Sequence, residues 1–195
     1  MSDLDLTRLM KNARISLPGA IDSAIKNELF AVMKEFFQKS SCWRETVPFG
    51  VDPDDTEQTY QLVPSMGIVT QLMWVKDEMG NQRRFGTMDE PGVLVLNETP
   101  SSPAEWTANI ALSVDEPKTE DGYPQFPQWV IDRYENGLLD GILGRMYGQP
   151  AKPYTSGQAA MMKMKFFRAT INEATIAANQ SNVYGAQAWR FPKFA

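Results

Sequence analysis

Two residues on one predicted helix have the spacing of a catalytic serine and its lysine. Ser23 and Lys26 fit the Ser-x-x-Lys pattern of serine acyltransferases, in which the lysine lowers the cost of deprotonating the serine. The companion Lys-Thr-Gly element is missing, because the one Lys-Thr pair continues to Glu120. Patterns of four residues arise by chance on amphipathic helices. We therefore interpret this one as structural and expect no catalytic residue.

Four acids between residues 52 and 57 have the composition of a calcium-binding loop but lack its sequence pattern. The segment has no glycine for the sharp turn and no glutamate at the distance that would complete the coordination shell. Asp-Pro-Asp-Asp is instead typical of a solvated turn. We expect no metal ion and no cofactor here. The four acids are Asp52, Asp54, Asp55 and Glu57.

The chain has no histidine, which removes several classes of chemistry. Ser-His-Asp and Cys-His catalysis, the HExxH zinc site and imidazole proton shuttles are all excluded. The single cysteine, Cys42, cannot form an intramolecular disulfide, which is typical of a reducing compartment. The chain starts with acids where a signal peptide has bases, and no apolar run approaches the roughly 18 residues that span a membrane. We expect a soluble protein, made in the cytoplasm, that is not an enzyme.

Four glycines share one face of a predicted helix that begins at Pro127. They follow one another at steps of four, three and four, and they form no phosphate-binding loop. Each costs about 1 kcal/mol relative to alanine inside a helix, so something must approach this backbone closely. We expect a neighbouring helix of the same bundle, with a neighbouring subunit as the alternative. The glycines are Gly137, Gly141, Gly144 and Gly148.

Apolar periodicity predicts four helices and a central β region. The helices are expected over about 4–15, 21–40, 127–146 and 156–178, the last capped by Thr155 or Ser156. Between Trp43 and Pro117 the period changes to two. Trp106, Ala108, Ile110, Leu112 and Val114 alternate with Thr107, Asn109, Ala111 and Ser113, as in a half-buried strand.

The strands of the central region are expected to form one small antiparallel sheet of about five or six strands. Residues 68–76 and 93–96 are apolar on both faces, as expected of inner strands, and Met79-Gly80-Asn81 is typical of a hairpin turn. The sequence thus predicts an α+β fold, in which an antiparallel β module (42–121) is inserted between the second and third helices of a discontinuous bundle (1–41 and 122–182). An extended C-terminal tail (183–195) follows.

Charge divides along the same boundaries. Residues 44–121 hold 15 acids and 5 bases, whereas the rest of the chain holds 9 acids and 14 bases, within a total net charge of −5. One interpretation is a set of solvated acidic loops. The other is a molecule with two functional ends, one facing an acidic partner and one repelling polyanions.

The last thirteen residues have the composition of a docking segment. Residues 183–195 contain four aromatics, two bases and no acid, and Gly185 and Pro192 disfavour a continuing helix. The segment is too aromatic for a disordered tail, so it should pack on something. We expect it to bind a partner protein, with packing on its own bundle as the alternative.

Three segments of the chain resemble the head-to-tail adaptor (connector or neck) proteins of tailed bacteriophages. They are residues 13–20 (ARISLPGA) running into Glu28-Leu29-Phe30, residues 147–154 (YGQPAKPY) and residues 182–192 (NVYGAQAWRFP). The resemblance extends over nearly the whole chain. The second and third segments are the more specific, because amphipathic helices like the first are common.

The resemblance implies a non-enzymatic structural protein of the virion. Its ring, twelvefold in similar proteins, would attach beneath the portal protein, carry the next tail or nozzle protein, and continue the DNA channel without sequence-specific binding. The C-terminal segment of similar proteins embeds in the portal, which implies portal contacts for Tyr184, Gly185, Gln187, Trp189, Arg190, Phe191, Pro192, Lys193 and Phe194. The aromatics would be anchors, and the arginine would pair with acidic portal groups.

Two other classes of function stay open on the sequence alone. A carboxylate-dependent hydrolase of cell-wall glycans needs two carboxyl groups that face one cleft. The 24 acids of this chain single out no such pair. A module whose β region binds a sugar or a peptide is the other alternative.

Overall fold

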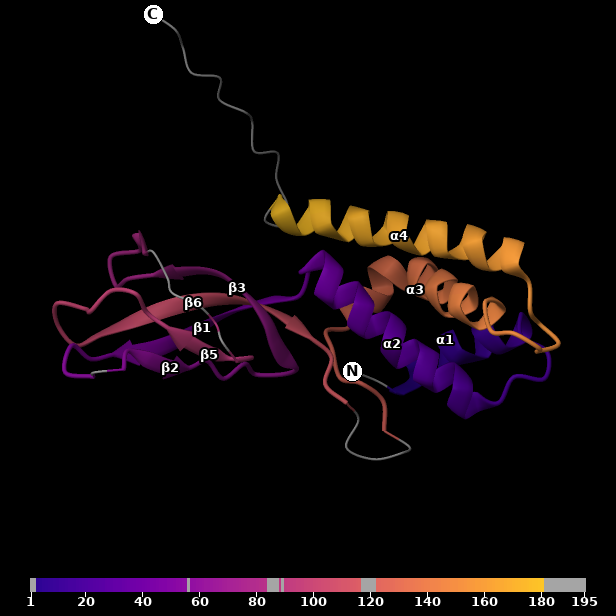
Figure 1. Ribbon diagram of the computed structural model, residues 1–195, viewed down its shortest axis with the longest axis horizontal. Coiled ribbons are helices and arrows are strands. Elements are labelled where there is room, and N and C mark those ends of the chain that lie inside the picture. Colours follow the sequence, from indigo (N-terminus) through magenta and orange to yellow (C-terminus); the bar gives the residue numbers. More distant parts are fainter. Residues whose placement is uncertain (1–2, 56, 84–87, 89, 117–121, 181–195) are drawn as a thin grey trace, which may run out of the picture.

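The computed structural model describes residues 3–55, 57–83, 88, 90–116 and 122–180. In this part of the chain, four helices form a bundle at one end of the molecule, and a β module forms the other end (Figure 1). The chain leaves the helical part after the second helix, builds the β module, and returns before the third helix. The expected α+β class, with antiparallel strands between helices two and three, is therefore confirmed.

The bundle is built from amphipathic helices whose apolar faces meet in one core. Helix α2 buries an apolar stripe at helical spacing, and α4 buries another, which the sequence predicts. Ser156 is the N-cap of α4 and accepts a hydrogen bond from the Ala159 amide at 3.3 Å. The helices are α1 (Asp3–Ile15), α2 (Asp22–Ser40), α3 (Trp129–Tyr147) and α4 (Gly157–Asn179).

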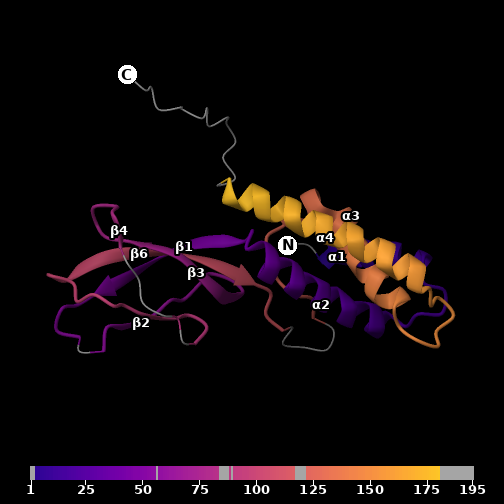
Figure 2. The ribbon, with the colours of Figure 1, turned by 45° about the horizontal axis from the view of Figure 1, so that its top comes forward.

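The β module contains two antiparallel sheets instead of the single sheet expected. The larger has the strand order β1-β6-β3-β4, and the smaller pairs β2 with β5. Figure 2 shows the smaller sheet lying under the larger one, and Phe49 of β1 packs against Tyr60 of β2 with ring centroids 5.4 Å apart. The strands are β1 (Arg44–Val51), β2 (Thr59–Gln61), β3 (Ile68–Lys76), β4 (Gln82–Arg83), β5 (Val93–Val95) and β6 (Ala104–Ser113).

The two predicted inner strands are less enclosed than their composition indicates. β5 pairs with β2 in the described part of the chain, so it is not an inner strand. Its two apolar faces arise because Leu94 is buried between the sheets while Val93 and Val95 are half-buried. β3 lies between β6 and β4, but the described residues of β4 pair with it at Val75 and Lys76 only.

Strand β6 alternates as expected along its first half and is then buried on both faces. Trp106, Ala108 and Ile110 point into the module core. Ala111 and Ser113, predicted on the solvent side, have no exposed area because this end of β6 contacts helix α2. The expected half-buried strand is thus wrong for its final residues.

An aromatic cluster joins the bundle to the β module. Helix α2 ends at Ser40 and is followed by the C-cap residue Ser41 in the left-handed conformation (φ 47°); the chain then enters β1 through Cys42 and Trp43. The Trp43 ring packs edge-on against Phe37 at 5.3 Å, and Phe37 lies 5.9 Å from Phe126. Gly67 (φ +78°) lies directly under the indole, where a Cβ would come within 2.6 Å of Trp43 Cη2. Bundle and module therefore share one continuous core.

Candidate functional site

All nine residues predicted to bind the portal lie outside the described residues. These are Tyr184, Gly185, Gln187, Trp189, Arg190, Phe191, Pro192, Lys193 and Phe194. The described chain ends at Gln180, directly after α4. These last described residues lie at the end of α4 nearest to the β module, where Arg44 of β1 donates a hydrogen bond to Asn179 Oδ1 at 3.1 Å.

Three of the four predicted glycines allow α4 to pack closely on α3. A Cβ at Gly137 would lie 2.3 Å from Thr170 Oγ1, and a Cβ at Gly144 would lie 2.8 Å from Met164 Cγ. At Gly141 a Cβ would meet Val32 of α2 at 2.8 Å as well as Phe167 of α4 at 3.0 Å. The neighbour at this face is thus a helix of the same chain.

Gly148 has a different position from the other three glycines. It follows the last residue of α3 as the C-cap, and a Cβ there would make ordinary contacts at 3.4 Å or more. The close approach expected for all four glycines is therefore wrong at Gly148. Gly148 keeps the helical spacing of the other three glycines, but it lies beyond the last turn in which α4 packs tightly against α3.

Acidic residues gather at the end of the β module that is distant from the bundle, which we call the distal end. The strand registers bring the ends of β1 and β3 and the start of β6 together here. Among the described residues, the bases of this end are Lys76 and Arg83. Its acids are Asp52, Asp54, Asp55, Glu57, Asp77, Glu78, Glu98 and Glu105. The predicted charge division thus becomes a local concentration of negative charge.

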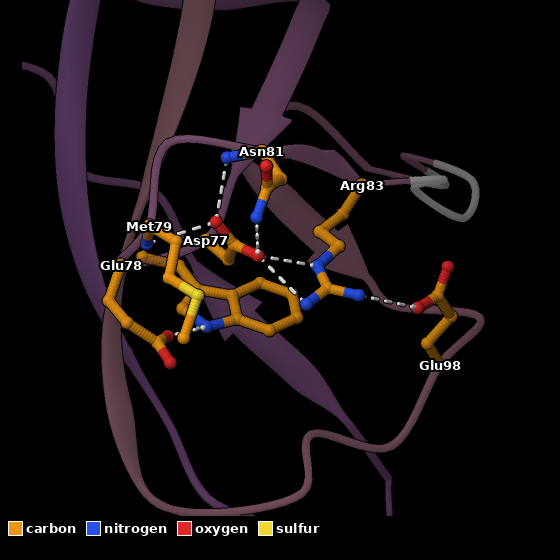
Figure 3. A network of polar contacts seen from close by, with 7 residues as sticks. Asp77, Glu78, Met79, Asn81, Arg83 and Glu98 are labelled. Carbon is orange, nitrogen blue, oxygen red and sulfur yellow. Dashed lines mark hydrogen bonds and ion pairs between the residues drawn. The ribbon is translucent and has the colours of Figure 1, made fainter.

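Asp77 organises the turn between β3 and β4 at the distal end (Figure 3). Its carboxylate accepts hydrogen bonds from the backbone amides of Met79 at 3.0 Å and Asn81 at 2.7 Å. It also accepts from Asn81 Nδ2 at 3.2 Å and from Arg83 Nε at 2.9 Å, although its side chain is only 2% exposed. This arrangement makes Met79-Gly80-Asn81 the hairpin turn that the sequence predicts.

The hydrogen bonds of Asp77 determine its protonation state. Burial alone would raise the pKa of this carboxyl, but hydrogen bonds from Asn81 and Arg83, together with the Arg83 charge, outweigh burial and lower it. We therefore expect Asp77 to be ionised at neutral pH in the folded protein. The alternation of apolar and polar residues that predicts strands gave no indication of this network, because Asp77 lies in the turn after β3, outside the alternating residues.

The acidic segment at residues 52–57 is a hydrogen-bonded turn. Asp52 Oδ1 accepts from the Asp54 amide at 3.0 Å, and Asp55 Oδ1 accepts from the Glu57 amide at 3.3 Å. Buried Gln58 donates to the Asp52 carbonyl at 2.9 Å and also to that of Asp55. Within the described residues, no group of three or more potential ligand side chains is arranged to hold a metal ion.

Ser23 and Lys26 line an open groove between α1 and α2 with a volume of about 360 Å³. Ser23 is exposed, and the Lys26 ammonium lies 5.1 Å above the ring centre of Tyr123. Arg14 also lines the groove and pairs with Asp22 at 3.2 Å. The serine and lysine are thus neighbours on a surface helix, as the structural interpretation requires.

Many of the bundle's bases are neutralised by acids on neighbouring helices. Arg8 of α1 pairs with Glu135 of α3 at 2.8 Å, and Lys163 of α4 pairs with Asp140 of α3 at 2.6 Å. Arg145 pairs with Glu35 of α2 at 2.6 Å. Burial would raise the pKa of Glu35, but hydrogen bonds and charges from Lys39 and Arg145 lower it. These pairs link neighbouring helices. In the part of the chain that the structure describes, Lys165 and Arg168 of α4 take part in none of them.

No family model matches the chain, and no curated protein is found to be similar to it. In the part of the chain that the structure describes, no helix combines the length and the apolar character needed to cross a membrane. The resemblance of the three sequence segments to phage adaptors therefore stays a prediction.

Proposed function

We propose that this chain is a structural component of a phage virion, a head-to-tail adaptor that attaches beneath the portal. In this role it forms a ring, twelvefold as in the family it resembles, which joins the capsid to the tail. One surface binds the portal and another carries the next tail or nozzle protein. DNA passes through the ring without sequence-specific contacts.

The separation of charge along the molecule is the observation that carries this proposal. Eight acids gather at the distal end of the β module, while α4 is basic and leads into the basic, aromatic residues 183–195. A surface rich in carboxylates repels the phosphates of passing DNA. A basic, aromatic surface fits an acidic protein partner. The joined core supports the role as well, because an adaptor must transmit contact from one end to the other.

The proposed function is tested by measuring the native mass of the chain with portal rings of the phage that encodes it. The full-length chain should add to the ring in a fixed multiple, whereas a chain that ends at Asn182 should not. If the full-length chain does not bind, the adaptor assignment is wrong.

The aromatic anchors are tested by the double substitution Trp189→Ala with Phe191→Ala. We expect weaker attachment to portal rings and an unchanged thermal unfolding midpoint. The matched control is Trp129→Ala, which removes a partly exposed tryptophan from the start of α3. Attachment equal to that of the unsubstituted chain would contradict the role given to these two side chains.

A further inference from the structure

Strand β1 forms one edge of the larger sheet. Among the described strands of that sheet it pairs with β6 alone, so one side of its backbone is hydrogen-bonded and the other is not. The pairing with β6 runs through all eight residues of β1 without a bulge. A long and regular edge of this kind presents free amides and carbonyls to which another strand can add.

The direction of the free backbone groups follows from one hydrogen bond beside the strand. The Leu112 amide donates to the Trp43 carbonyl at 2.9 Å, so Trp43 directs its backbone groups toward β6. Successive residues of an antiparallel strand alternate in this direction, and the register stays unbroken along β1. The residues that direct their backbone groups away from β6 are therefore Arg44, Thr46, Pro48 and Gly50.

Pro48 lies in the middle of this free edge. It is exposed, as are Thr46 and Gly50 on either side. Proline has no amide hydrogen, and its ring fills the space into which that hydrogen would point. Because Pro48 faces away from β6, it costs the existing sheet no hydrogen bond. A strand that added to this edge would lose a hydrogen bond at its centre and would meet the proline ring.

Charged side chains do not protect the rest of this edge. Arg44 donates to the Ser41 carbonyl at 2.8 Å, at the start of the strand. Glu45 is engaged as well, since it accepts from the Ser65 amide at 3.0 Å. The remaining six residues of β1 read Thr-Val-Pro-Phe-Gly-Val and carry no charge. Without its proline, this uncharged segment would have the composition of strands that pair with copies of themselves.

Strand β3, toward the other side of the sheet, is irregular where β1 is regular. Its register against β6 shifts between Val69 and Gln71 and again between Leu72 and Trp74. Such bulges increase the local twist and hinder the approach of another strand. Strand β1 has neither a bulge nor a lysine, so Pro48 is the feature that distinguishes its edge.

We infer that Pro48 closes the β1 edge to the β1 strand of a second copy of this chain. Without it, two copies could pair antiparallel about a twofold axis and join their larger sheets into one. With Pro48 in place, the free chain keeps this edge unpaired. The inference goes beyond the proposed function and does not depend on it, because it rests on the sheet alone.

The self-pairing has a favoured register, which explains why a second copy is the strand to be excluded. When all four free residues take part, Arg44 of one copy faces Gly50 of the other, and Thr46 faces position 48. Gly50 pairs with Glu105 of β6, so the arginine of one copy would approach an acid of the other. Proline at position 48 removes one hydrogen bond at each of the two symmetric sites.

The test is Pro48→Thr, which supplies the missing amide and a residue that favours strands. Light scattering over a series of concentrations should show the unsubstituted chain as a monomer. The variant should form dimers with a dissociation constant at least tenfold lower, because both symmetric hydrogen bonds are restored. In hydrogen exchange, the amides of Thr46 and Gly50 should exchange rapidly in the unsubstituted chain and slowly in the variant. Circular dichroism should show equal helix content in both chains.

The matched control is Pro103→Thr, which replaces an exposed proline just before β6 and should leave the chain a monomer. A second variant, Pro48→Thr with Gly50→Lys, should return the chain to a monomer, because it adds a lysine to the edge. This site has room, since a Cβ at Gly50 meets nothing within 4 Å.

Three results would overturn the inference. The first is a Pro48→Thr chain that stays a monomer at every concentration. The second is association of that variant while the amides of Thr46 and Gly50 still exchange rapidly, because another surface would then be responsible. The third needs no variant: slow exchange of these two amides in the unsubstituted chain would mean that the edge is paired although Pro48 is present.

Discussion

The Asp77 carboxylate provides the hydrogen-bond acceptors for the β3–β4 turn at the distal end of the module. It meets two backbone amides, the Asn81 side chain and the Arg83 guanidinium at 2.7–3.2 Å. Hydrogen bonds to an ionised acceptor are stronger than neutral ones. We therefore expect Asp77→Asn to lower the midpoint of thermal unfolding at neutral pH, because asparagine keeps the shape but loses the charge and one acceptor.

The pH dependence follows from the lowered pKa of Asp77. Because the pKa is lower in the folded chain than in the unfolded chain, the stabilisation is present above the usual aspartate range and disappears as the pH falls through the folded value. The difference between the unsubstituted chain and Asp77→Asn should thus be constant near pH 7 and shrink below about pH 4. Urea unfolding at several pH values measures it.

Glu98 supplies the control for this prediction. Its contact with Arg83 is 3.9 Å long and both side chains are over 40% exposed, so Glu98→Gln should change stability little. An equal loss in both variants would mean that general acidity at the distal end, and not the Asp77 network, stabilises the turn.

At the scale of elements, the packing of α4 on α3 depends on glycines that leave room for Thr170, Phe167 and Met164. Gly137→Ala should improve helix propensity by about 1 kcal/mol in isolation. Its Cβ, however, would lie 2.3 Å from Thr170 Oγ1, and forcing extra volume into a packed interface costs about 1–3 kcal/mol. We expect net destabilisation by chemical unfolding.

Gly157→Ala is the matched control, since the site lies in the first turn of α4 and a Cβ there meets nothing within 4 Å. This variant should be as stable as the unsubstituted chain or slightly more so. A stable Gly137→Ala chain would mean that α4 can shift away from α3 without loss.

The elements themselves could largely be predicted from local patterns, whereas their pairing could not. The stripe from Ile25 to Phe37 and the cap at Ser156 are set by neighbouring residues, so helix boundaries agree within a few residues. The division into two sheets depends on which distant strands meet. Leu94 is apolar whether β5 joins a large sheet or lies under it, so composition did not distinguish the two arrangements.

The predicted and the missed parts of the candidate site differ in the same way: local sequence indicates the first, whereas contacts formed on folding create the second. The C-terminal aromatics are visible in the sequence because four of them gather with two bases and no acid in thirteen residues, and they lie outside the described residues. The Asp77 network was missed, because no local pattern in the sequence indicates which groups fold back onto this carboxylate.

At the scale of the whole molecule, the shared core makes the bundle and the β module one mechanical unit. Trp43 packs on Phe37 of α2 and over Gly67, and its carbonyl accepts the Leu112 amide at 2.9 Å. An adaptor that holds the portal at one end and a tail protein at the other needs this stiffness. The unsubstituted chain should therefore unfold in a single transition, with circular dichroism of the helices and tryptophan fluorescence changing together.

Replacing Trp43 tests whether this coupling depends on the aromatic cluster. Trp43→Ala removes a side chain that is only 5% exposed, which costs about 3–5 kcal/mol, and it leaves a cavity where bundle and module meet. We expect the two probes to report separate midpoints in this variant, because the cavity weakens the joint more than either part. Trp129→Ala, at 37% exposure, should keep a single transition. Coincident midpoints in Trp43→Ala would mean that the β6–α2 contact is sufficient to couple the two parts.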